Sequence, residues 1–531
     1  MDPSPGPPAH DSDRTPFQHP GDAPPAPPAP AAAARGRRPD PGSRSAATIA
    51  WLILIPVLAA VVGLQQFAVR AVSGQIAEQA QKAVVPPTPA DAISLTGRLT
   101  VAISEMLETA GSGMPEDQQR DTLESYLDAL EGNAGSPSEW IRVAIVAGDV
   151  LGAEAAEDRL ETAADLVEKS ADQEGGASEE LAAALRSDIA ALRAIYNGEP
   201  LEPAQADALE AHHGWFGRLA QVYDMDDAAR SPVIGSWLAL LVLMLGAVAG
   251  GIVLVLVGVV LMIVLIVKMA SGRLTPRFVA PAPGGSVYLE TFTAFVLGFL
   301  LLQGFGVLID SLVGGQTAVL VSLAAQWLLL PIAAWPVLRG VPWATWREQI
   351  GLVAPGGVLK EIGAGVVGYL AGLPLLLTGA GITLVLLLLR EVLTGGSGTT
   401  PTGEERVPLG PTSPSNPVID TVSGQGPVTL VLLGSLVVVW APVVEELILR
   451  GALYRHLRAW LYWLVAAAVS AVLFGILHQY DALMLGPVIA LGVTFAIVRE
   501  WRGSLIGAIT GHALHNGTVF VLLLTLVWLG G

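Results

Sequence analysis

The sequence predicts an all-α polytopic membrane protein, with about nine transmembrane helices and an inserted helical extracytoplasmic domain. Two observations predict this class. The chain of 531 residues is 52% hydrophobic and only 14% charged, which is more apolar surface than soluble cores could bury. The apolar residues also form runs long enough to cross a bilayer as helices. The chain has no cysteine, which excludes disulfides, cysteine nucleophiles and thiolate metal sites.

The N-terminal region predicts a tail and a membrane anchor. Residues 1–45 are rich in proline, alanine and glycine and almost lack large apolar residues, a composition typical of a disordered tail. The apolar run 46–69 follows directly, and we interpret it as a retained transmembrane anchor, because no tidy cleavage site precedes it. Arginines cluster just before the run and predict a cytoplasmic N-terminus.

Residues 70–231 predict an acidic helical domain outside the membrane. Residues 71–231 hold 30 acidic and 10 basic side chains, a net charge of −20 against −18 for the whole chain. Apolar residues recur at three- and four-residue spacing in segments such as 152–170, the pattern of amphipathic helices. We interpret the acidic faces as solvated surface, with a cation site as the alternative. His212 and His213 beside Trp215 are interpreted as packing residues, with a ligand role as the alternative.

The remaining spans begin near residue 235. Residues 232–334 predict helices that link to a core at 335–531, with a polar outer loop near 394–426. We place the spans near 236–268, 290–312, 316–338, 361–390, 427–457, 462–479, 483–499 and 503–529. Basic residues fall in alternate loops and predict an extracytoplasmic C-terminus. Arginine outnumbers lysine 25 to 4, which with the alanine, glycine and proline content indicates a bacterial cell membrane as the location.

Ionisable groups within the last spans are the main functional signal, because each costs roughly 2.5–3.5 kcal/mol at a helix centre on insertion scales. Glu446 and Arg450 are four residues apart, so they share a helix face and can pair. Glu445 is rotated by about 100° on the same turn, which leaves its carboxylate free to face a cavity. The alternative is that all three residues form an ion network that only holds helices together.

Two further pairs have the same four-residue spacing. Phe474 and His478 lie in one predicted span, and His512 and Asn516 in the last one, with His515 off that face. Counted along the helices, Glu445 and both histidines reach similar depths and predict one buried polar site. A desolvated carboxylate can act as general base on water with an imidazole to orient it. A histidine and an amide can then stabilise the oxyanion, so the set predicts peptide-bond hydrolysis.

At these residues the sequence resembles the CPBP family of CAAX prenyl endopeptidases and bacteriocin-processing proteins. The motifs are EExxxR (Glu445, Glu446, Arg450), FxxxH (Phe474, His478) and HxxxN (His512, Asn516). The resemblance covers about residues 335–531. It implies that Glu445 activates water with help from His478, and that His512 and Asn516 stabilise the oxyanion. Glu446 and Arg450 are then supporting residues.

The resemblance leaves the cofactor open, because the family was long described as metalloproteases. We favour a site without metal, and the alternative is zinc held by Glu445, His478 and His512 with one open position.

The expected partners are the lipid bilayer and a membrane-anchored protein or peptide substrate, and no nucleic acid. Two rivals are a non-proteolytic scaffold or immunity protein that keeps the motif structurally, and a transporter with a buried proton relay. A transporter would usually show internal repeats, and the sequence shows none.

Overall fold

A computed structural model describes residues 38–530 apart from residues 86, 88–90, 110–114, 173–176, 236, 395–425, 479 and 481. Every element in this part of the chain is helical, and its one β-bridge joins Pro39 to Ala282. The predicted all-α polytopic class is therefore confirmed. The predicted tail at residues 1–37 and the predicted outer loop from residue 395 to 425 lie outside the described residues.

Eight helical segments of the described chain are long and apolar enough to cross a membrane. They are Arg44–Leu64, Leu241–Ala270, Val287–Leu312, Gly315–Leu338, Val358–Arg390, Pro427–Arg458, Ala482–Arg502 and Ile506–Thr525. A ninth apolar helix, α20 (Trp463–Ile476), has only 14 residues, about 21 Å at 1.5 Å per residue. The predicted span at 462–479 is therefore present but shorter than a full bilayer crossing.

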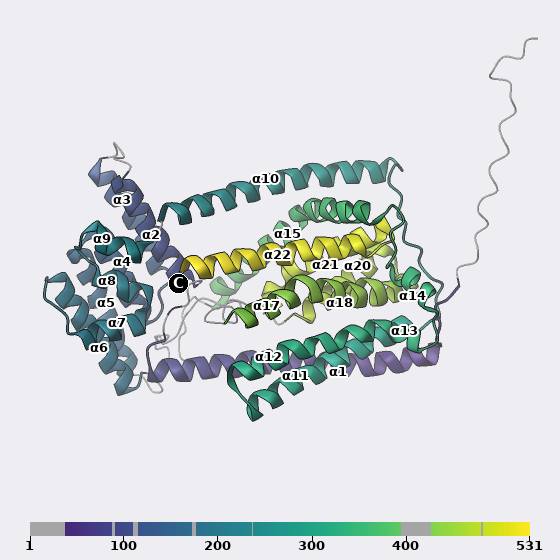
Figure 1. Ribbon diagram of the computed structural model, residues 1–531, viewed down its shortest axis with the longest axis horizontal. Coiled ribbons are helices and arrows are strands. Elements are labelled where there is room, and N and C mark those ends of the chain that lie inside the picture. The colour runs from purple at the N-terminus through teal and green to yellow at the C-terminus, as the bar shows by residue number, and fades with distance from the viewer. Residues whose placement is uncertain are drawn as a thin grey trace, which may run out of the picture.

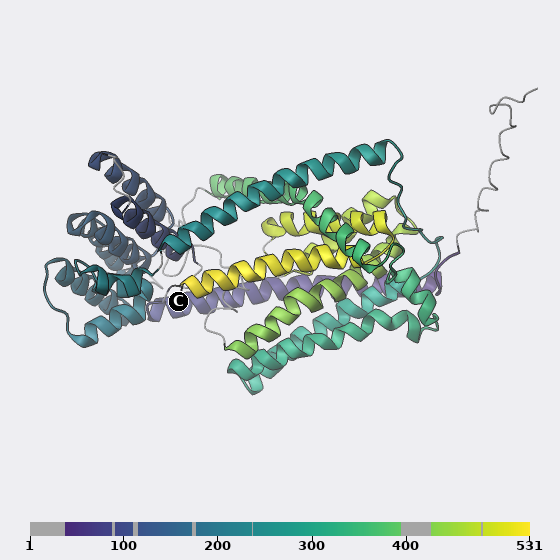
Figure 2. The same cartoon turned by 45° about the horizontal axis from the view of Figure 1, so that its top comes forward.

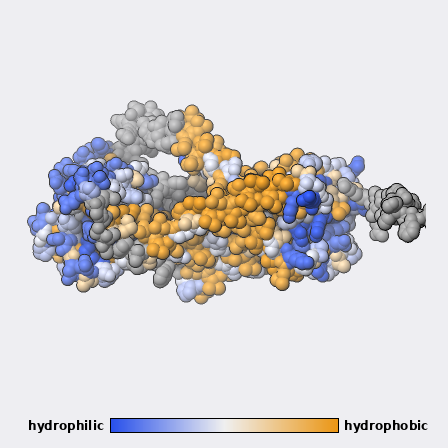
Figure 3. All heavy atoms as spheres, turned by 90° about the horizontal axis from the view of Figure 1, so that it is seen from above, coloured by the Kyte–Doolittle hydropathy of each residue, from blue (hydrophilic) through white to orange (hydrophobic). Residues whose placement is uncertain are grey.

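The first spans surround the C-terminal ones, and the helices run roughly parallel (Figures 1 and 2). An apolar band separates two hydrophilic ends of the molecule, as membrane burial requires (Figure 3). The helices of this part are α1 (Arg44–Lys82), α10 (Trp237–Ala270), α11 (Val287–Leu312), α12 (Gly315–Ala325), η1 (Gln326–Ala334), α13 (Trp335–Leu338), α14 (Trp343–Ile350) and α15 (Val358–Thr394).

The EExxxR motif lies on a long helical rod that includes two π-helical segments. The rod consists of α17 (Pro427–Ser435), η2 (Leu436–Trp440), α18 (Ala441–Glu445), η3 (Glu446–Leu453) and α19 (Tyr454–Arg458). Pro442 has no N–H to donate to the carbonyl four residues earlier, which disturbs the α-helical ladder at this point. The chain ends with α20, η4 (Ala482–Met484), α21 (Leu485–Arg502) and α22 (Ile506–Gly530), so all three motifs lie on neighbouring helices.

The domain predicted to lie outside the membrane, which we call the outer domain, is a separate bundle of short helices at one end of the molecule (Figure 1). Its elements are α2 (Ala92–Thr109), α3 (Glu116–Glu131), α4 (Pro137–Leu151), α5 (Ala153–Asp172), α6 (Glu179–Tyr196), α7 (Pro203–His213), α8 (Trp215–Gln221) and α9 (Asp227–Ile234). Helix α4 is almost wholly buried, and Ser136 and Glu139 form a capping box at its start. The acidic residues thus surround an apolar core centred on α4.

The opposite end of the membrane bundle carries the basic loops, and we call it the basic end. Its exposed cations include Lys268, Arg273, Arg347 and Lys360. Here the chain before α1 is held in place, because Asp40 forms a 2.7 Å ion pair with Arg455. The backbone N–H groups of Ser286 and Val287 also donate to the Pro41 carbonyl. Residues 38–45 therefore belong to the folded protein, and the predicted tail boundary at residue 45 must move toward the N-terminus.

Candidate active site

The centre of the motif cluster is a fully buried ion pair. Arg450 donates to Glu446 Oε1 at 2.8 Å, and neither side chain is exposed. The predicted pair is therefore present. Arg450 also donates to the Gly492 carbonyl of α21 at 3.0 Å. A Cβ on Gly492 would lie 2.8 Å from the Ala471 side chain of α20, so glycine permits the close packing that brings this carbonyl to the arginine.

His512 on α22 joins both glutamates. Its Nδ1 lies 3.1 Å from Glu446 Oε1, and its Nε2 lies 3.8 Å from Glu445 Oε2. Because Glu446 is a carboxylate paired with arginine, it acts as acceptor and assigns the proton of His512 to Nδ1. Nε2, the other ring nitrogen, then faces Glu445. The arrangement is a chain of contacts from Arg450 through Glu446 and His512 to Glu445.

Glu445 is the surplus acid of the cluster. One fifth of its side chain is exposed, yet its Oε2 atom is buried and has no hydrogen-bond partner among the described residues. A buried polar atom without a partner is rare in folded proteins. Glu446 is committed to Arg450 and His512 through Oε1, although its Oε2 is also buried without a partner, whereas the Glu445 carboxylate forms no hydrogen bond with a described residue.

Phe474 brings the two histidines of the motifs together. Its ring lies edge-on to His478 at 4.5 Å and to His512 at 5.8 Å between centroids. The guanidinium of Arg450 lies 4.5 Å from the same ring, a cation–π contact. His478 Nδ1 lies 2.8 Å from the Phe474 carbonyl, which can only accept, so this nitrogen donates and Nε2 keeps its lone pair.

Asn516 lies one turn beyond His512, but its amide is partly committed. Its Nδ2 donates to the Val437 carbonyl in η2 at 2.9 Å, which leaves one amide hydrogen. The predicted oxyanion role thus rests on that second N–H. His515 is predicted to lie off the helix face that His512 and Asn516 share. Its Nδ1 lies 3.3 Å from the Tyr369 hydroxyl on α15.

Sequence reasoning missed Phe495 on α21. Its ring stacks on His512 at 5.0 Å between centroids, with an interplanar angle of 20°, and Arg450 lies 5.5 Å from the same ring. Phe495 is only 1% exposed. A phenylalanine among apolar residues gives no signal in a single sequence, so only the packing of α21 against α22 reveals its contact with the cluster.

The candidate zinc ligands are not gathered as a coordination sphere. Across the described residues, no group of three or more His, Asp or Glu side chains is arranged to hold a metal ion. His512 and His478 each bind a protein oxygen through Nδ1, which leaves Nε2 of both rings outside those contacts. In this arrangement Glu445, His478 and His512 are not drawn together as a set of zinc ligands.

One family model matches the chain, and it spans all three motifs. The model is described as Type II CAAX prenyl endopeptidase Rce1-like, and it matches residues 427–518. The predicted resemblance is confirmed over this segment, which begins later than the predicted limit near residue 335. No curated protein and no solved structure matches the chain.

Proposed function

We propose that the protein is an intramembrane endopeptidase that cleaves a membrane-associated protein or peptide with water activated by Glu445. The observation that supports this most directly is the buried Glu445 oxygen without a partner. The adjacent acid, Glu446, is neutralised by Arg450. A carboxylate that no cation neutralises, beside one that is ion-paired, is the arrangement that general base catalysis needs. The Rce1-like match supports the same class of enzyme.

The proposed reaction begins when Glu445 accepts a proton from water and the oxygen attacks the scissile carbonyl. His478, through the free lone pair of Nε2, orients that water. The second amide hydrogen of Asn516 donates to the oxyanion of the tetrahedral intermediate. His512, doubly protonated throughout, donates Nε2–H to the same oxyanion while Nδ1–H stays on Glu446, so it neither gains nor loses a proton during the reaction. Glu445 then returns its proton to the leaving amine as the carbon–nitrogen bond breaks. Glu446 acts by holding His512 in one orientation, as the acid of a triad does.

The decisive experiment compares the N-termini of membrane proteins in cells that carry wild type or Glu445→Gln. We expect a set of N-termini that is present with wild type and absent with Glu445→Gln. Glu348→Gln is the matched control, because Glu348 is exposed and lies in α14 outside the cluster. Identical termini in all three strains, with equal amounts of inserted protein, would contradict proteolysis.

One observation favours the scaffold as a second candidate. The Glu446–Arg450–His512 network joins the EExxxR rod to α22 and could stabilise the bundle without turnover. In that case Glu446→Gln would impair folding, while Glu445→Gln would change neither folding nor any membrane protein terminus. The same strains therefore distinguish the two functions.

We further propose that hydrolysis needs no bound metal, which the arrangement of the side chains supports. Purified wild type dialysed against a zinc chelator should keep its activity on a substrate found by the terminus mapping. Loss of activity that added zinc restores, together with one bound zinc per chain by elemental analysis, would contradict this proposal.

We also propose a bacterial cell membrane as the location, with the basic end in the cytoplasm and the outer domain outside. The positive-inside rule supports this orientation. Because the chain has no cysteine, single cysteines can report it directly. Lys360→Cys should resist an impermeant thiol reagent in intact cells, and Glu199→Cys should react. The reverse pattern would overturn the orientation.

A further inference from the structure

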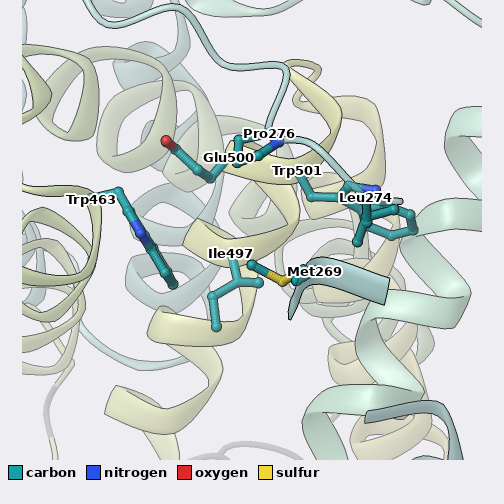
Figure 4. A pocket seen from close by; sticks show the side chains of 7 residues that line it. All are labelled: Met269, Leu274, Pro276, Trp463, Ile497, Glu500 and Trp501. Carbon is teal, nitrogen blue, oxygen red and sulfur yellow. The ribbon is translucent and has the colours of Figure 1, made fainter. Parts of the chain in front are cut away.

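A small apolar cavity lies at the basic end, apart from the motif cluster (Figure 4). It is a partly open hollow, and its empty volume of about 310 Å³ counts space that is open to the surroundings. The last turn of α10, the following loop, the start of α20 and the last turns of α21 form its walls. The apolar lining consists of Met269, Leu274, Pro276, Trp463, Ile497 and Trp501.

The one acidic residue of the lining offers no polar group to a ligand. Glu500 accepts from the Tyr454 hydroxyl at 2.8 Å and from Arg458 at 2.9 Å. Its carboxylate is therefore satisfied by neighbours in α19. An interior without free donors or acceptors suits hydrocarbon, because a polar ligand would lose its hydrogen bonds to water there.

The cavity also lies where a bilayer changes from hydrocarbon to headgroups. Its Trp463 and Trp501 indoles carry one polar N–H on an apolar ring, and tryptophan is enriched at this depth of the membrane. Helix α10, which forms one wall, exposes large apolar residues along its length, such as Val260 and Ile266. Lipid therefore surrounds this wall and can reach the cavity from the side.

Two basic residues are next to lining residues of the cavity in the sequence. Lys268 and Arg273 are exposed and form no ion pair with a described residue. They flank Met269 and Leu274 in the sequence, and the chain holds no acidic residue from 237 to 289. Two uncompensated cations beside an apolar cavity complement an anionic headgroup joined to an acyl chain. Each basic residue near a membrane surface adds about a fivefold preference for anionic lipid.

We infer that this cavity binds an anionic phospholipid of the adjoining leaflet, with an acyl chain among Trp463, Ile497 and Trp501 and the phosphate at Lys268 and Arg273. Neither the Rce1-like match nor the proposed hydrolysis requires such a site. The site would attach α10, which lies outside the matched segment, to the ends of α20 and α21. Its ligand is distinct from the protease substrate, so its test does not depend on turnover.

The test measures lipid affinity of the purified full-length protein by native mass spectrometry, with phosphatidylglycerol and phosphatidylcholine as probes. Wild type should prefer phosphatidylglycerol. The Lys268→Gln/Arg273→Gln variant should bind phosphatidylglycerol roughly 25-fold more weakly, at about fivefold per cation. The matched control is Arg347→Gln/Lys360→Gln, which removes two exposed cations elsewhere at the basic end and should change affinity less than threefold.

A second variant tests the cavity itself. Leu274→Trp adds bulk from the loop and should displace the acyl chain, with loss of both lipids from the tightest site. Quenching of tryptophan fluorescence by brominated phosphatidylglycerol should also fall in Trp463→Phe/Trp501→Phe relative to wild type. Equal affinity for the two lipids, or equal losses in both double-glutamine variants, would overturn the inference. Unchanged binding by Leu274→Trp would overturn it too, since the lipid would then touch only the surface.

Discussion

The described chain buries a carboxylate beside histidine in the membrane bundle and in the outer domain, and the two clusters differ in two respects. In the membrane bundle, Glu446 contacts His512 and pairs directly with Arg450. In the outer domain, the buried Asp188 lies 2.8 Å from His212 and 3.2 Å from His213. There the buried arginine, Arg142, donates to the backbone carbonyls of Val85 and His212, and it makes no ion pair with Asp188.

The two clusters also differ in the number of acidic side chains. The outer cluster has one carboxylate, and one of its oxygens receives both histidines, so it ties α6 to α7. Arg142 also donates to the Val85 carbonyl, so it holds the segment that joins α1 to the outer domain. The membrane cluster has a second acid, Glu445, that no partner satisfies within the described chain. Histidine beside buried carboxylate is thus compatible with a purely structural role, and the surplus acid is what marks the candidate active site.

The largest expected effect is a difference in stability between variants of the two glutamates of the motif. Glu446→Gln leaves Arg450 as a buried charge without its partner, which costs about 3–5 kcal/mol. Glu445→Gln removes no hydrogen bond seen in the structure and should cost less than about 1 kcal/mol. The free energy of unfolding in mixed micelles titrated with dodecyl sulfate measures both. Similar losses in the two variants would remove the distinction between a structural acid and a free one.

A double variant controls for nonspecific damage to the bundle. Glu446→Gln/Arg450→Met removes both charges and should recover part of the stability lost in Glu446→Gln, because no buried charge remains unpaired. Further loss in the double variant would mean that Arg450 contributes mainly through the Gly492 carbonyl and the Phe474 ring.

The second effect concerns the outer cluster. Asp188→Asn removes the acceptor shared by His212 and His213 and should cost about 1–3 kcal/mol, the usual penalty for a buried group left unsatisfied. Hydrogen exchange in the full-length protein should rise in α6 and α7 and stay unchanged in α20 to α22. Faster exchange throughout the membrane helices would contradict the view that the two clusters are independent.

Much of the membrane cluster was predictable from sequence, for a physical reason. Glu445, Glu446, Arg450, His478 and His512 are polar groups in apolar spans, where each is costly and therefore conspicuous. The Glu446–Arg450 pair follows from helical spacing alone. The all-α class follows from the lengths of the apolar runs, whereas the predicted count of about nine spans exceeds the eight described helices that are long enough to cross a membrane.

The remaining features depend on how helices meet, which spacing within one helix does not reveal. The contact between His512 and Glu446 joins residues 66 positions apart, and the stacking of Phe495 involves a residue type that is ordinary in any span. The hydrogen bond from Asn516 to Val437 meets a π-helical segment, which a regular 3.6-residue period does not predict. The attachment of residues 38–43 was missed because their composition is that of the tail, while one side chain, Asp40, meets Arg455.

The third prediction tests the attachment of residues 38–43 to the membrane bundle. Asp40→Asn should cost about 1–2 kcal/mol, at the lower end for a hydrogen-bonded charge pair, since Arg455 still donates to the Gln349 carbonyl. A disulfide offers a positive test in this cysteine-free chain. Ser43→Cys/Ser286→Cys should form a crosslink on mild oxidation, because the Ser43 N–H donates to Ser286 Oγ at 3.1 Å. Failure to crosslink would show that residues 38–43 do not rest on α11.

The smallest effect is a pH dependence confined to the outer cluster. The hydrogen bond with Asp188 raises the pKa of His212, whereas burial lowers the pKa of His213. His212 therefore contributes stability that is present below its unfolded pKa of about 6.5 and is lost as pH rises. His213 contributes in the opposite sense, because its neutral form is favoured by folding and acidification removes that stability. The two contributions offset each other between about pH 8 and pH 5.5.

Removing one histidine should expose the contribution of the other. In His212→Asn, acidification from pH 8 to pH 5.5 should destabilise the outer domain more than it does in wild type, because only the contribution of His213 remains. The effect is small because His212 is partly exposed and water screens its charge. Hydrogen exchange in α7 at several pH values, corrected for intrinsic rates, measures it, and Glu446→Gln serves as a control that should leave the slope in α7 unchanged. Equal slopes in His212→Asn and wild type would mean that His212 contributes nothing to the pH dependence, and that its hydrogen bond with Asp188 does not favour the protonated imidazole in the folded protein.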